Sequence, residues 1–289
     1  MKRLDDVNMG EYTSFRAGGI AKRMILVDNQ EELSAALREL QSQGRDYFFL
    51  GNGSDVLFAD GGYDGTVLRA GQGFDSIVQK DNLLICGSAV LLSQIAHTAQ
   101  DLGLSGMEAL AGIPGSVGGA VYMNAGAYGR ELKDVLHTVN MLSADGRQLY
   151  SVPAADMEMG YRTSRIQKTG EIVLSVAIQL ERGDPQTIAK AMGEYRARRK
   201  EKQPLQYPSA GSFFKRPEGR FAGQLIEEAG LKGLSVGGAQ VSEKHAGFII
   251  NRGNATATDI LELMRLVQRT VQDRTGILLE PEVQIVGKQ

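Results

Sequence analysis

The chain of 289 residues has little cysteine, histidine and proline: it contains one cysteine, three histidines and seven prolines, and no tryptophan. A single cysteine excludes a disulfide within the chain and a metal cluster built on cysteine. The histidines His97, His137 and His245 are scattered, without a partner at metal-ligand spacing, so we expect no metal site. Cys86 lies in an apolar segment, and we expect a small buried hydrophobic residue rather than a reactive thiol.

The sequence also lacks an excess of charge and a long apolar run. Its net charge is −2, with 42% hydrophobic and 23% charged residues, as in an ordinary globular protein, so we expect no general affinity for nucleic acid. No stretch of about 18 uncharged apolar residues is present, which argues against a membrane-spanning helix. Residues 1–6 are followed by no apolar run, which argues against a signal peptide. We therefore expect a cytoplasmic protein.

Glycine, in contrast, is abundant, with 36 residues, and it is concentrated in a few segments. Four glycines and a proline lie within residues 112–119, and Asn124-Ala125-Gly126 follows soon after. We expect neither a helix nor an ordinary strand there. Because glycine lets another group approach the backbone, the segment predicts a backbone wrapped around a pyrophosphate or a flat ring. A loop of tight turns is the weaker interpretation.

A second segment of this kind follows the expected strand Tyr47–Leu50. It reads Gly51-Asn52-Gly53-Ser54-Asp55, and its backbone N–H groups and hydroxyl suit an anion. Asn52-Gly53 is also the commonest hairpin turn, so both interpretations stay open. The segment is not a dinucleotide fingerprint, because Val56 stands where the third glycine belongs, and it is not a P-loop, because no Gly-Lys-Ser/Thr follows.

Hydrophobic periodicity predicts an α+β protein. The first expected elements form a β-α-β unit, and from residue 66 to about 180 short strands dominate, with one amphipathic helix at 92–102. A helix after the N-cap Asp184 then leads to a linker at 204–208. The remaining expected elements are a helix at 221–229, a strand at 247–251, a long helix capped near Thr258 and closed by Gly276, and a final strand at 278–286.

Three small groups of residues have side chains suited to chemistry. In Gly160-Tyr161-Arg162, the planar fork of Arg162 suits a carboxylate, although a surface arginine in a loop is favoured on sequence alone. Ser212 precedes two phenylalanines, which predicts either a partly desolvated hydroxyl or a turn serine. No nucleophile elbow surrounds Ser212 and no histidine is marked as its partner, so acyl transfer has little support.

The third group is Glu280-Pro281-Glu282, framed by apolar residues. Strand alternation predicts that the two glutamates share a face. A carboxylate in such surroundings often has a raised pKa and can act as an acid. An exposed start of a strand is about equally consistent with the pattern.

Taken together, these motifs resemble those of the UDP-N-acetylenolpyruvoylglucosamine reductase family along the full length of the chain. Their order and joint presence are highly specific, although no single motif is. The matching segments are residues 12–19, 50–57, 112–129, 160–162, 210–215, 241–248 and 279–283. The short region between Glu181 and Ser209 resembles the compact second subtype, which lacks an extra substrate-clamping loop.

The resemblance implies a vanillyl-alcohol-oxidase/PCMH-type FAD-binding fold of two lobes plus a C-terminal α+β substrate domain. The expected FAD-binding domain is 1–183, with lobes at about 1–70 and 71–183; 184–208 connects it to the substrate domain at 209–289. Whether the last strand returns to the first lobe stays open. The implied reaction uses NADPH and non-covalent FAD to reduce the enolpyruvyl ether of UDP-N-acetylglucosamine-enolpyruvate to UDP-N-acetylmuramate for peptidoglycan.

The resemblance also assigns roles to single residues. Arg162 and Glu282 match the pair that stabilises the intermediate, and Ser212 matches the proton donor. Arg199 and Lys202 match basic positions facing the substrate diphosphate, and Tyr161 and Lys215 are further expected substrate contacts. The expected FAD contacts are Gly51, Asn52, Gly53, Ser54, Asp55, Pro114, Gly115, Ser116, Gly119, Ala120 and Ile172.

The chain departs from the family pattern at two positions. Many members have asparagine where Arg216 stands, and Asp55 is often asparagine, so the nucleotide contacts at Arg216 are in doubt and Asp55 either lies near the pyrophosphate or caps a turn. Another FAD oxidoreductase of the same fold is the alternative enzyme, and a non-catalytic nucleotide-sugar binding protein is the alternative without turnover. We expect a monomer or a weak dimer.

Overall fold

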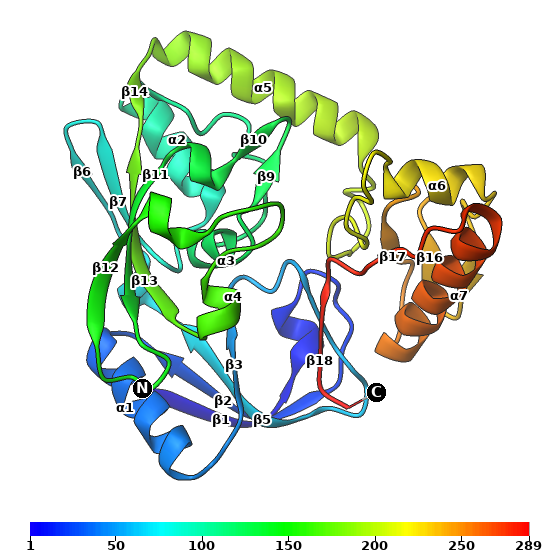
Figure 1. Cartoon of the computed structure of the whole chain (residues 1–289), viewed down its shortest axis with the longest axis horizontal. Coiled ribbons are helices and arrows are strands. Elements are labelled where there is room, and N and C mark those ends of the chain that lie inside the picture. Colours follow the sequence, from blue (N-terminus) through cyan, green and yellow to red (C-terminus); the bar gives the residue numbers. More distant parts are fainter. Residues whose placement is uncertain (289) are drawn as a thin grey trace. The chain divides into compact units, whose positions relative to one another are not determined.

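The structure is a computed structural model and describes residues 1–288 (Figure 1). Gln289, the last residue of the expected substrate domain, lies outside the described residues. Contacts between residues divide the chain into two units. The first unit consists of Met1–Leu4, Met24–Asn52 and Gly65–Arg199, and the second consists of Asp5–Arg23, Gly53–Asp64 and the chain from Lys200 onward.

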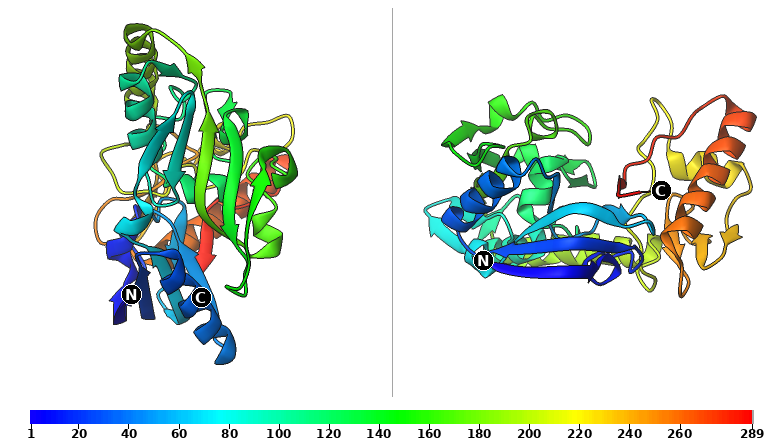
Figure 2. Two further views of the ribbon diagram at one scale, coloured as in Figure 1. Left: turned by 90° about the vertical axis from the view of Figure 1, so that its left-hand side faces the viewer. Right: turned by 90° about the horizontal axis from the view of Figure 1, so that it is seen from below.

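A five-stranded antiparallel sheet organises the first unit, in the order β12-β11-β13-β7-β6. The left view of Figure 2 shows its three green strands running side by side. The helices α2 (Leu92–Asp101) and α3 (Val117–Tyr122) pack against it with apolar side chains. The strands are β6 (Ile77–Lys80), β7 (Leu83–Gly87), β11 (Leu136–Leu142), β12 (Leu149–Pro153) and β13 (Ile172–Gln179).

A second sheet has the order β1-β2-β5-β3. Its strands are β1 (Lys2–Asn8), β2 (Ile20–Val27), β3 (Tyr47–Leu50) and β5 (Tyr63–Ala70). The expected helix is α1 (Gln30–Ser42), which begins where the Asn29 side chain accepts a hydrogen bond from the Glu32 N–H, and it ends before Gly44, whose φ is +58°. The strands β2 and β3 that flank α1 are not neighbours, because β5 lies between them and pairs in parallel with β3.

The expected helix after Asp184 is α5 (Pro185–Lys202), which runs along the top of Figure 1. It begins where Asp184 Oδ2 accepts hydrogen bonds of 2.8 Å from both the N–H and the hydroxyl of Thr187. The short elements are β8 (Leu104–Ser105), which pairs with β14 (Glu181–Arg182), β9 (Gly126–Ala127), β10 (Arg130–Glu131), α4 (Ile166–Thr169) and the 3-10 helices Met9–Tyr12, Gln72–Phe74, Leu132–Asp134 and Ala154–Met157.

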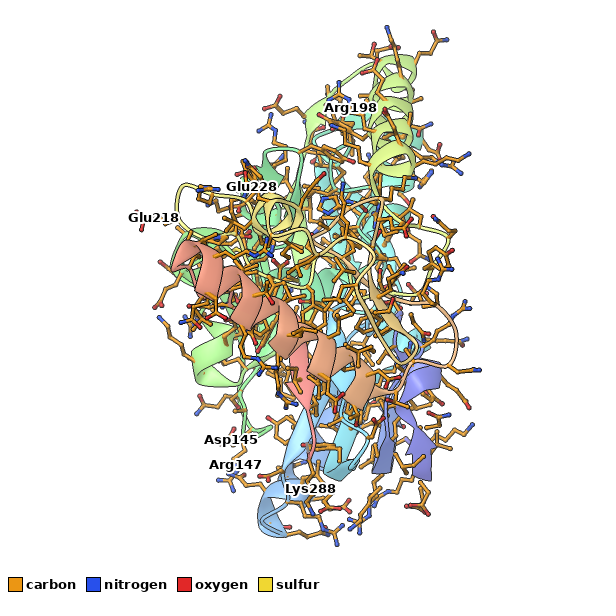
Figure 3. All side chains as sticks on the ribbon, turned by 90° about the vertical axis from the view of Figure 1, so that its right-hand side faces the viewer. Asp145, Arg147, Arg198, Glu218, Glu228 and Lys288 are labelled. Atoms are coloured by element: carbon orange, nitrogen blue, oxygen red, sulfur yellow. The ribbon has the colours of Figure 1, made fainter. Side chains whose placement is uncertain are left out.

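The second unit is built on a three-stranded sheet that packs against α7 (Ala257–Thr275), the helix that crosses the foreground of Figure 3, and α6 packs against α7. The elements are β15 (Ser235–Val236), β16 (Ala239–Val241), β17 (Ile249–Asn251), α6 (Ala222–Glu228) and α7 (Ala257–Thr275). The expected cap near Thr258 is Thr256, while the backbone N–H and the hydroxyl of Thr258 both donate to Asp60. Gly276 ends α7 with φ +73°, as expected.

The last strand is shorter than expected. Only β18 (Gln284–Val286) forms a regular strand, and it pairs in parallel with β4 (Val56–Phe58) within the second unit. The preceding residues pair with Phe214 only through an isolated bridge at Pro281. Proline has no N–H to donate, so a continuous ladder does not form through this position.

Two absences predicted from the sequence concern membrane helices and reactive thiols. Over residues 1–288, no helix is both long enough and apolar enough to cross a bilayer. Cys86 is fully buried, and this burial raises the pKa of its thiol to about 12. The expectation that Cys86 is a buried hydrophobic residue is therefore confirmed.

Candidate active site

The two glycine-rich segments, which lie about 60 residues apart in sequence, meet in the first unit. The Asn52 side-chain amide donates a hydrogen bond of 2.6 Å to the carbonyl oxygen of Pro114. A Cβ atom added to Gly51 would lie 2.9 Å from Ser116 Oγ, so the tip of β3 runs directly against the second segment. The hairpin interpretation of Asn52-Gly53 is wrong, because β3 pairs with β5 and β4 pairs with β18.

The expectation that the segment 112–119 contains no helix is also wrong. α3 starts at Val117, and Ser116 caps it by accepting a hydrogen bond of 3.5 Å from the Gly119 N–H. Glycine costs a helix about 1 kcal/mol relative to alanine, but here it permits close packing. A Cβ atom on Gly118 would lie 3.0 Å from the carbonyl oxygen of Ser88, which accepts the Gly118 N–H.

The end of the first glycine-rich segment belongs to the second unit and is fixed there independently. Gly53 has φ +65°, and its carbonyl oxygen accepts a hydrogen bond of 2.9 Å from the Ser14 N–H. A Cβ atom at Gly53 would overlap the carbonyl oxygen of Tyr12, so only glycine fits. The Asp55 carbonyl accepts a hydrogen bond of 3.0 Å from the Gln284 N–H.

Arg162 occupies a strained position in a tight turn. The backbones of Gly160 and Thr163 exchange hydrogen bonds of 3.1 and 3.4 Å across the turn, and Arg162 adopts φ +55°. Its guanidinium carbon lies 4.9 Å from the ring centre of Tyr161, which is 45% exposed. A left-handed conformation in a residue other than glycine is uncommon and is concentrated at functional sites. Arg162 is therefore a candidate functional residue.

Arg199 lies beside the start of the second glycine-rich segment. A Cβ atom on Gly112 would come within 3.0 Å of Arg199 Nη1, and burial lowers the pKa of the Arg199 guanidinium, an effect that Tyr128 partly offsets. The rings of Tyr128 and Tyr195 stack at 4.8 Å, and Arg198, labelled in Figure 3, lies 6.0 Å from the Tyr195 ring.

Such a cluster of aromatic rings and cations suits an anion that carries a flat ring. Sequence reasoning found Arg199 but missed both tyrosines, although Tyr195 lies next to the basic run 196–202. Lys202, the other expected diphosphate contact, is exposed and belongs to the second unit.

In the second unit, backbone pairing brings the segment of Ser212 beside that of Glu282. The Glu282 N–H donates to the carbonyl of Phe213 at 2.8 Å, and the Lys215 N–H donates to the carbonyl of Glu280 at 2.9 Å. Ser212 follows Gly211, which has φ +79°. The expectation of a partly desolvated serine is wrong for this unit, because Ser212 is exposed and only the two phenylalanines after it are buried.

Glu280 and Glu282 have different surroundings. Glu280 is 71% exposed at its side chain and forms an ion pair of 3.5 Å with Lys215. Glu282 is partly buried, beside the buried Val283. Burial therefore selects Glu282 as the candidate functional carboxylate. Within the described residues 1–288, no three His, Cys, Asp or Glu side chains are grouped to hold a metal ion.

Comparison with protein families matches two parts of the chain. Residues 203–286 match the UDP-N-acetylenolpyruvoylglucosamine reductase C-terminal domain, and residues 21–150 match an FAD binding domain. The expected α+β fold with an FAD-binding domain is thus confirmed.

Full-length relatives carry the same name. The chain is 44% identical to the UDP-N-acetylenolpyruvoylglucosamine reductase of Alkaliphilus oremlandii, over 98% of this chain and 93% of that protein. It is 45% identical to the reductase of Exiguobacterium sibiricum, over 96% of this chain and 91% of the relative. The crystal structure of the reductase from Thermus caldophilus matches with a TM-score of 0.85 at 37% identity, covering 99% of this chain and 98% of that one.

Proposed function

Because the chain belongs to the UDP-N-acetylenolpyruvoylglucosamine reductase family, we propose that Arg162, Ser212 and Glu282 carry its chemistry. The chain is an FAD-containing oxidoreductase that reduces the enolpyruvyl ether of a UDP-linked amino sugar for peptidoglycan synthesis. The alternatives of another flavin oxidoreductase and of a binding protein without turnover are set aside by the full-length matches.

The glycine-rich segments support the binding of FAD. The polar groups around Gly51 and Ser116 are backbone N–H groups, the Asn52 amide, which donates to Pro114, and the Ser116 hydroxyl, which caps α3. Such neutral groups fit the pyrophosphate of a dinucleotide. We assign to FAD the residues Gly51, Asn52, Gly53, Ser54, Asp55, Pro114, Gly115, Ser116, Gly119, Ala120 and Ile172. When bound, FAD would supply hydride transfer between the reductant, which we propose to be NADPH, and the methylene carbon of the substrate.

We assign Arg162 and Glu282 to the charge that develops on the substrate. Hydride addition to the methylene carbon leaves negative charge on the adjacent carbon, delocalised into the carboxylate. The Arg162 guanidinium can bind that carboxylate with two parallel N–H groups. A protonated Glu282 can donate a hydrogen bond to it, and the partial burial of Glu282 supports this role.

We assign the role of proton donor to Ser212. The carbon next to the carboxylate must gain one proton to complete the reduction, and a hydroxyl serves as the acid because the carbanion is very basic. The exposure of Ser212 in its own unit leaves its hydroxyl accessible to a ligand. We further assign Tyr161, Arg199, Lys202 and Lys215 to the UDP-sugar, whose diphosphate requires cationic partners.

Several broader features of the protein belong to the same proposal. We propose an FAD-binding domain at 1–183, a connection at 184–208 and a substrate domain at 209–289. We also propose a cytoplasmic monomer or weak dimer that binds no nucleic acid. The observation that carries the catalytic proposal is the left-handed turn that holds Arg162.

The variant Ser212→Ala tests the proposal, with Ser235→Ala, an exposed serine of the same unit, as its matched control. We expect Ser212→Ala to retain flavin bleaching by NADPH but to lose substrate reduction by a factor of about 10² to 10⁴. Stopped-flow absorbance separates the two steps, and Ser235→Ala should change neither. If Ser212→Ala also loses bleaching, Ser212 has another role.

A further inference from the structure

We propose that Asn124 is the positioning residue for Arg162, holding the arginine turn against the C-terminus of α3. This inference rests on the role proposed for Arg162. Asn124 is fully buried, although asparagine is rarely so, and its polar atoms are all turned toward protein groups.

The backbone conformation at position 124 limits which residues fit there. α3 ends in a Schellman motif, because the Ala125 N–H donates to the Ala120 carbonyl at 2.9 Å and the Asn124 N–H donates to the Val121 carbonyl at 3.3 Å. The motif places Asn124 in the left-handed region, with φ +44°. Glycine is the usual residue at this position, so the backbone alone would not select asparagine.

The side-chain hydrogen bonds explain why asparagine, and not glycine, stands at position 124. Its Nδ2 donates at 2.9 Å to the carbonyl oxygen of Gly160, the first residue of the arginine turn. Nδ2 also donates to Glu131 Oε2 at 3.0 Å, and Oδ1 accepts the Lys133 N–H at 3.1 Å. These bonds fix the orientation of the amide. If its oxygen and nitrogen were exchanged, the amide oxygen would face two other acceptors, the Gly160 carbonyl and the Glu131 carboxylate.

The other end of the arginine turn is tied to the same helix terminus. Gln167 Nε2 donates both to the Tyr122 carbonyl at 2.8 Å and to the Arg162 carbonyl at 3.1 Å. Ser164 Oγ also donates to the Tyr122 carbonyl, at 2.7 Å. The Tyr122 carbonyl belongs to the last turn of α3, where carbonyl groups lack partners within the helix. The arginine segment therefore satisfies the end of α3, and α3 in turn fixes that segment.

This arrangement gives α3 two functions in the first unit. Its first residues follow the Ser116 cap beside Gly51, and its end holds the turn of Arg162. A left-handed arginine persists only where surrounding bonds determine the backbone, and Asn124 and Gln167 supply bonds on both sides of it. The same six-residue helix thus joins the proposed flavin cradle to the proposed carboxylate clamp.

The variant Asn124→Gly separates the effect of the backbone from that of the side chain, because glycine keeps the left-handed backbone and removes only the amide. The matched control is Asn254→Gly, which changes an exposed asparagine at φ +55° in the second unit. We expect Asn124→Gly to slow reoxidation of the reduced flavin by the enolpyruvyl substrate about 10- to 100-fold, as for a slightly misplaced catalytic group. The rate of flavin reduction by NADPH and the dissociation constant of FAD should change less than about threefold. Asn254→Gly should change neither these two quantities nor the rate of reoxidation.

A second variant, Gln167→Ala, guards against misfolding, because Gln167 is exposed. It should affect the same step in the same direction. A fall in both half-reactions, or a loss of FAD in the Asn124→Gly protein, would show a general structural role and overturn the proposal.

The double variant with Arg162→Ala tells whether Asn124 acts through the arginine. If it does, Asn124→Gly has no further effect on reoxidation in the Arg162→Ala background, whereas independent effects would multiply. Multiplying effects overturn the positioning role. If Arg162→Ala itself leaves reoxidation unchanged, the role proposed for Arg162 fails; if Arg162→Ala slows it and Asn124→Gly does not, only the positioning role fails.

Discussion

The side-chain amide of Asn52 donates a hydrogen bond of 2.6 Å to the carbonyl oxygen of Pro114, 62 residues further along the chain. The bond joins the tip of β3 to the segment that leads into α3. Beside it, Gly51 lies so close to Ser116 that no Cβ atom fits without movement. Gly51 and Asn52 are therefore in direct contact with the second glycine-rich segment, and this close approach accounts for the glycine at position 51.

We predict that Gly51→Ala weakens FAD binding by about 1–3 kcal/mol, because the new Cβ atom would press on Ser116 Oγ at 2.9 Å and push the segments apart. Titration of the apoprotein with FAD, followed by flavin fluorescence, measures the effect. Gly193→Ala is the matched control, since nothing lies within 4 Å of a Cβ atom there. That substitution should stabilise α5 by about 0.5–1 kcal/mol and leave FAD affinity unchanged. Equal FAD affinities for the two variants would contradict the cradle.

We predict different outcomes for the same substitution at two glutamates that flank Pro281. Glu282→Gln should lower substrate reduction by about 10²-fold or more, because an amide cannot serve as a carboxylic acid toward the developing charge. Glu280→Gln breaks only an exposed ion pair with Lys215 and should change stability by less than about 1 kcal/mol. The rates of flavin reoxidation in the two variants test this prediction. A loss of activity in Glu280→Gln alone would mean that the wrong carboxylate has been chosen.

Arg162→Gly should separate stability from activity. Glycine adopts φ +55° without strain, so we predict a midpoint of thermal unfolding equal to or above that of the unchanged protein. Substrate reduction should nevertheless fall sharply, since the guanidinium is lost. Calorimetry and steady-state kinetics on the same preparation test both parts. A clearly less stable protein would indicate that the arginine side chain serves the fold instead.

The buried acid Glu171 makes a prediction about pH. Burial pushes the pKa of Glu171 upward, but hydrogen bonds from Arg165, Tyr150 and Thr169 outweigh it and hold this pKa below its usual value of 4.5. Its Oε1 lies 2.8 Å from Arg165 Nη2, and its side chain is only 8% exposed.

A pKa lowered by folding gives stability that is present above the unfolded value and is lost as the pH falls through the folded value. Glu171→Gln should therefore be less stable than the unchanged protein at pH 7, by about 1–3 kcal/mol, and the difference should narrow below about pH 4.5. Urea unfolding at several pH values measures this. Glu218→Gln, at an exposed site labelled in Figure 3, is the control and should stay within about 0.5 kcal/mol throughout. A difference that does not narrow in acid would contradict the assignment.

Much of the fold followed from local patterns in the sequence. The helices α2 and α5 lie where periodicity and the N-cap Asp184 placed them, because their signals are local. The helix α3 was missed, since its two glycines argue against a helix and only the packing on Ser88 explains them. The last strand was overextended, because the bridge between Phe214 and Pro281 is a contact distant in sequence.

The sequence identified most residues of the candidate site but not the contacts between them. Each glycine-rich segment was identified, but their meeting at Asn52 and Pro114 depends on the tertiary fold. The two phenylalanines after Ser212 allowed either a partly desolvated hydroxyl or a turn serine, and the structure buries both rings but leaves the serine exposed. Asn124 was seen only as part of a motif, since its bond to Gly160 spans 36 residues.

The visible spectrum of the purified protein tests the account most directly, recorded before and after anaerobic NADPH and again after UDP-N-acetylglucosamine-enolpyruvate is added. We predict flavin absorption that NADPH bleaches and that the enolpyruvyl substrate restores. Bleaching without recovery would contradict the assigned substrate. A protein that stays colourless after FAD is supplied would contradict the flavin site at Gly51 and Ser116, and with it the whole account.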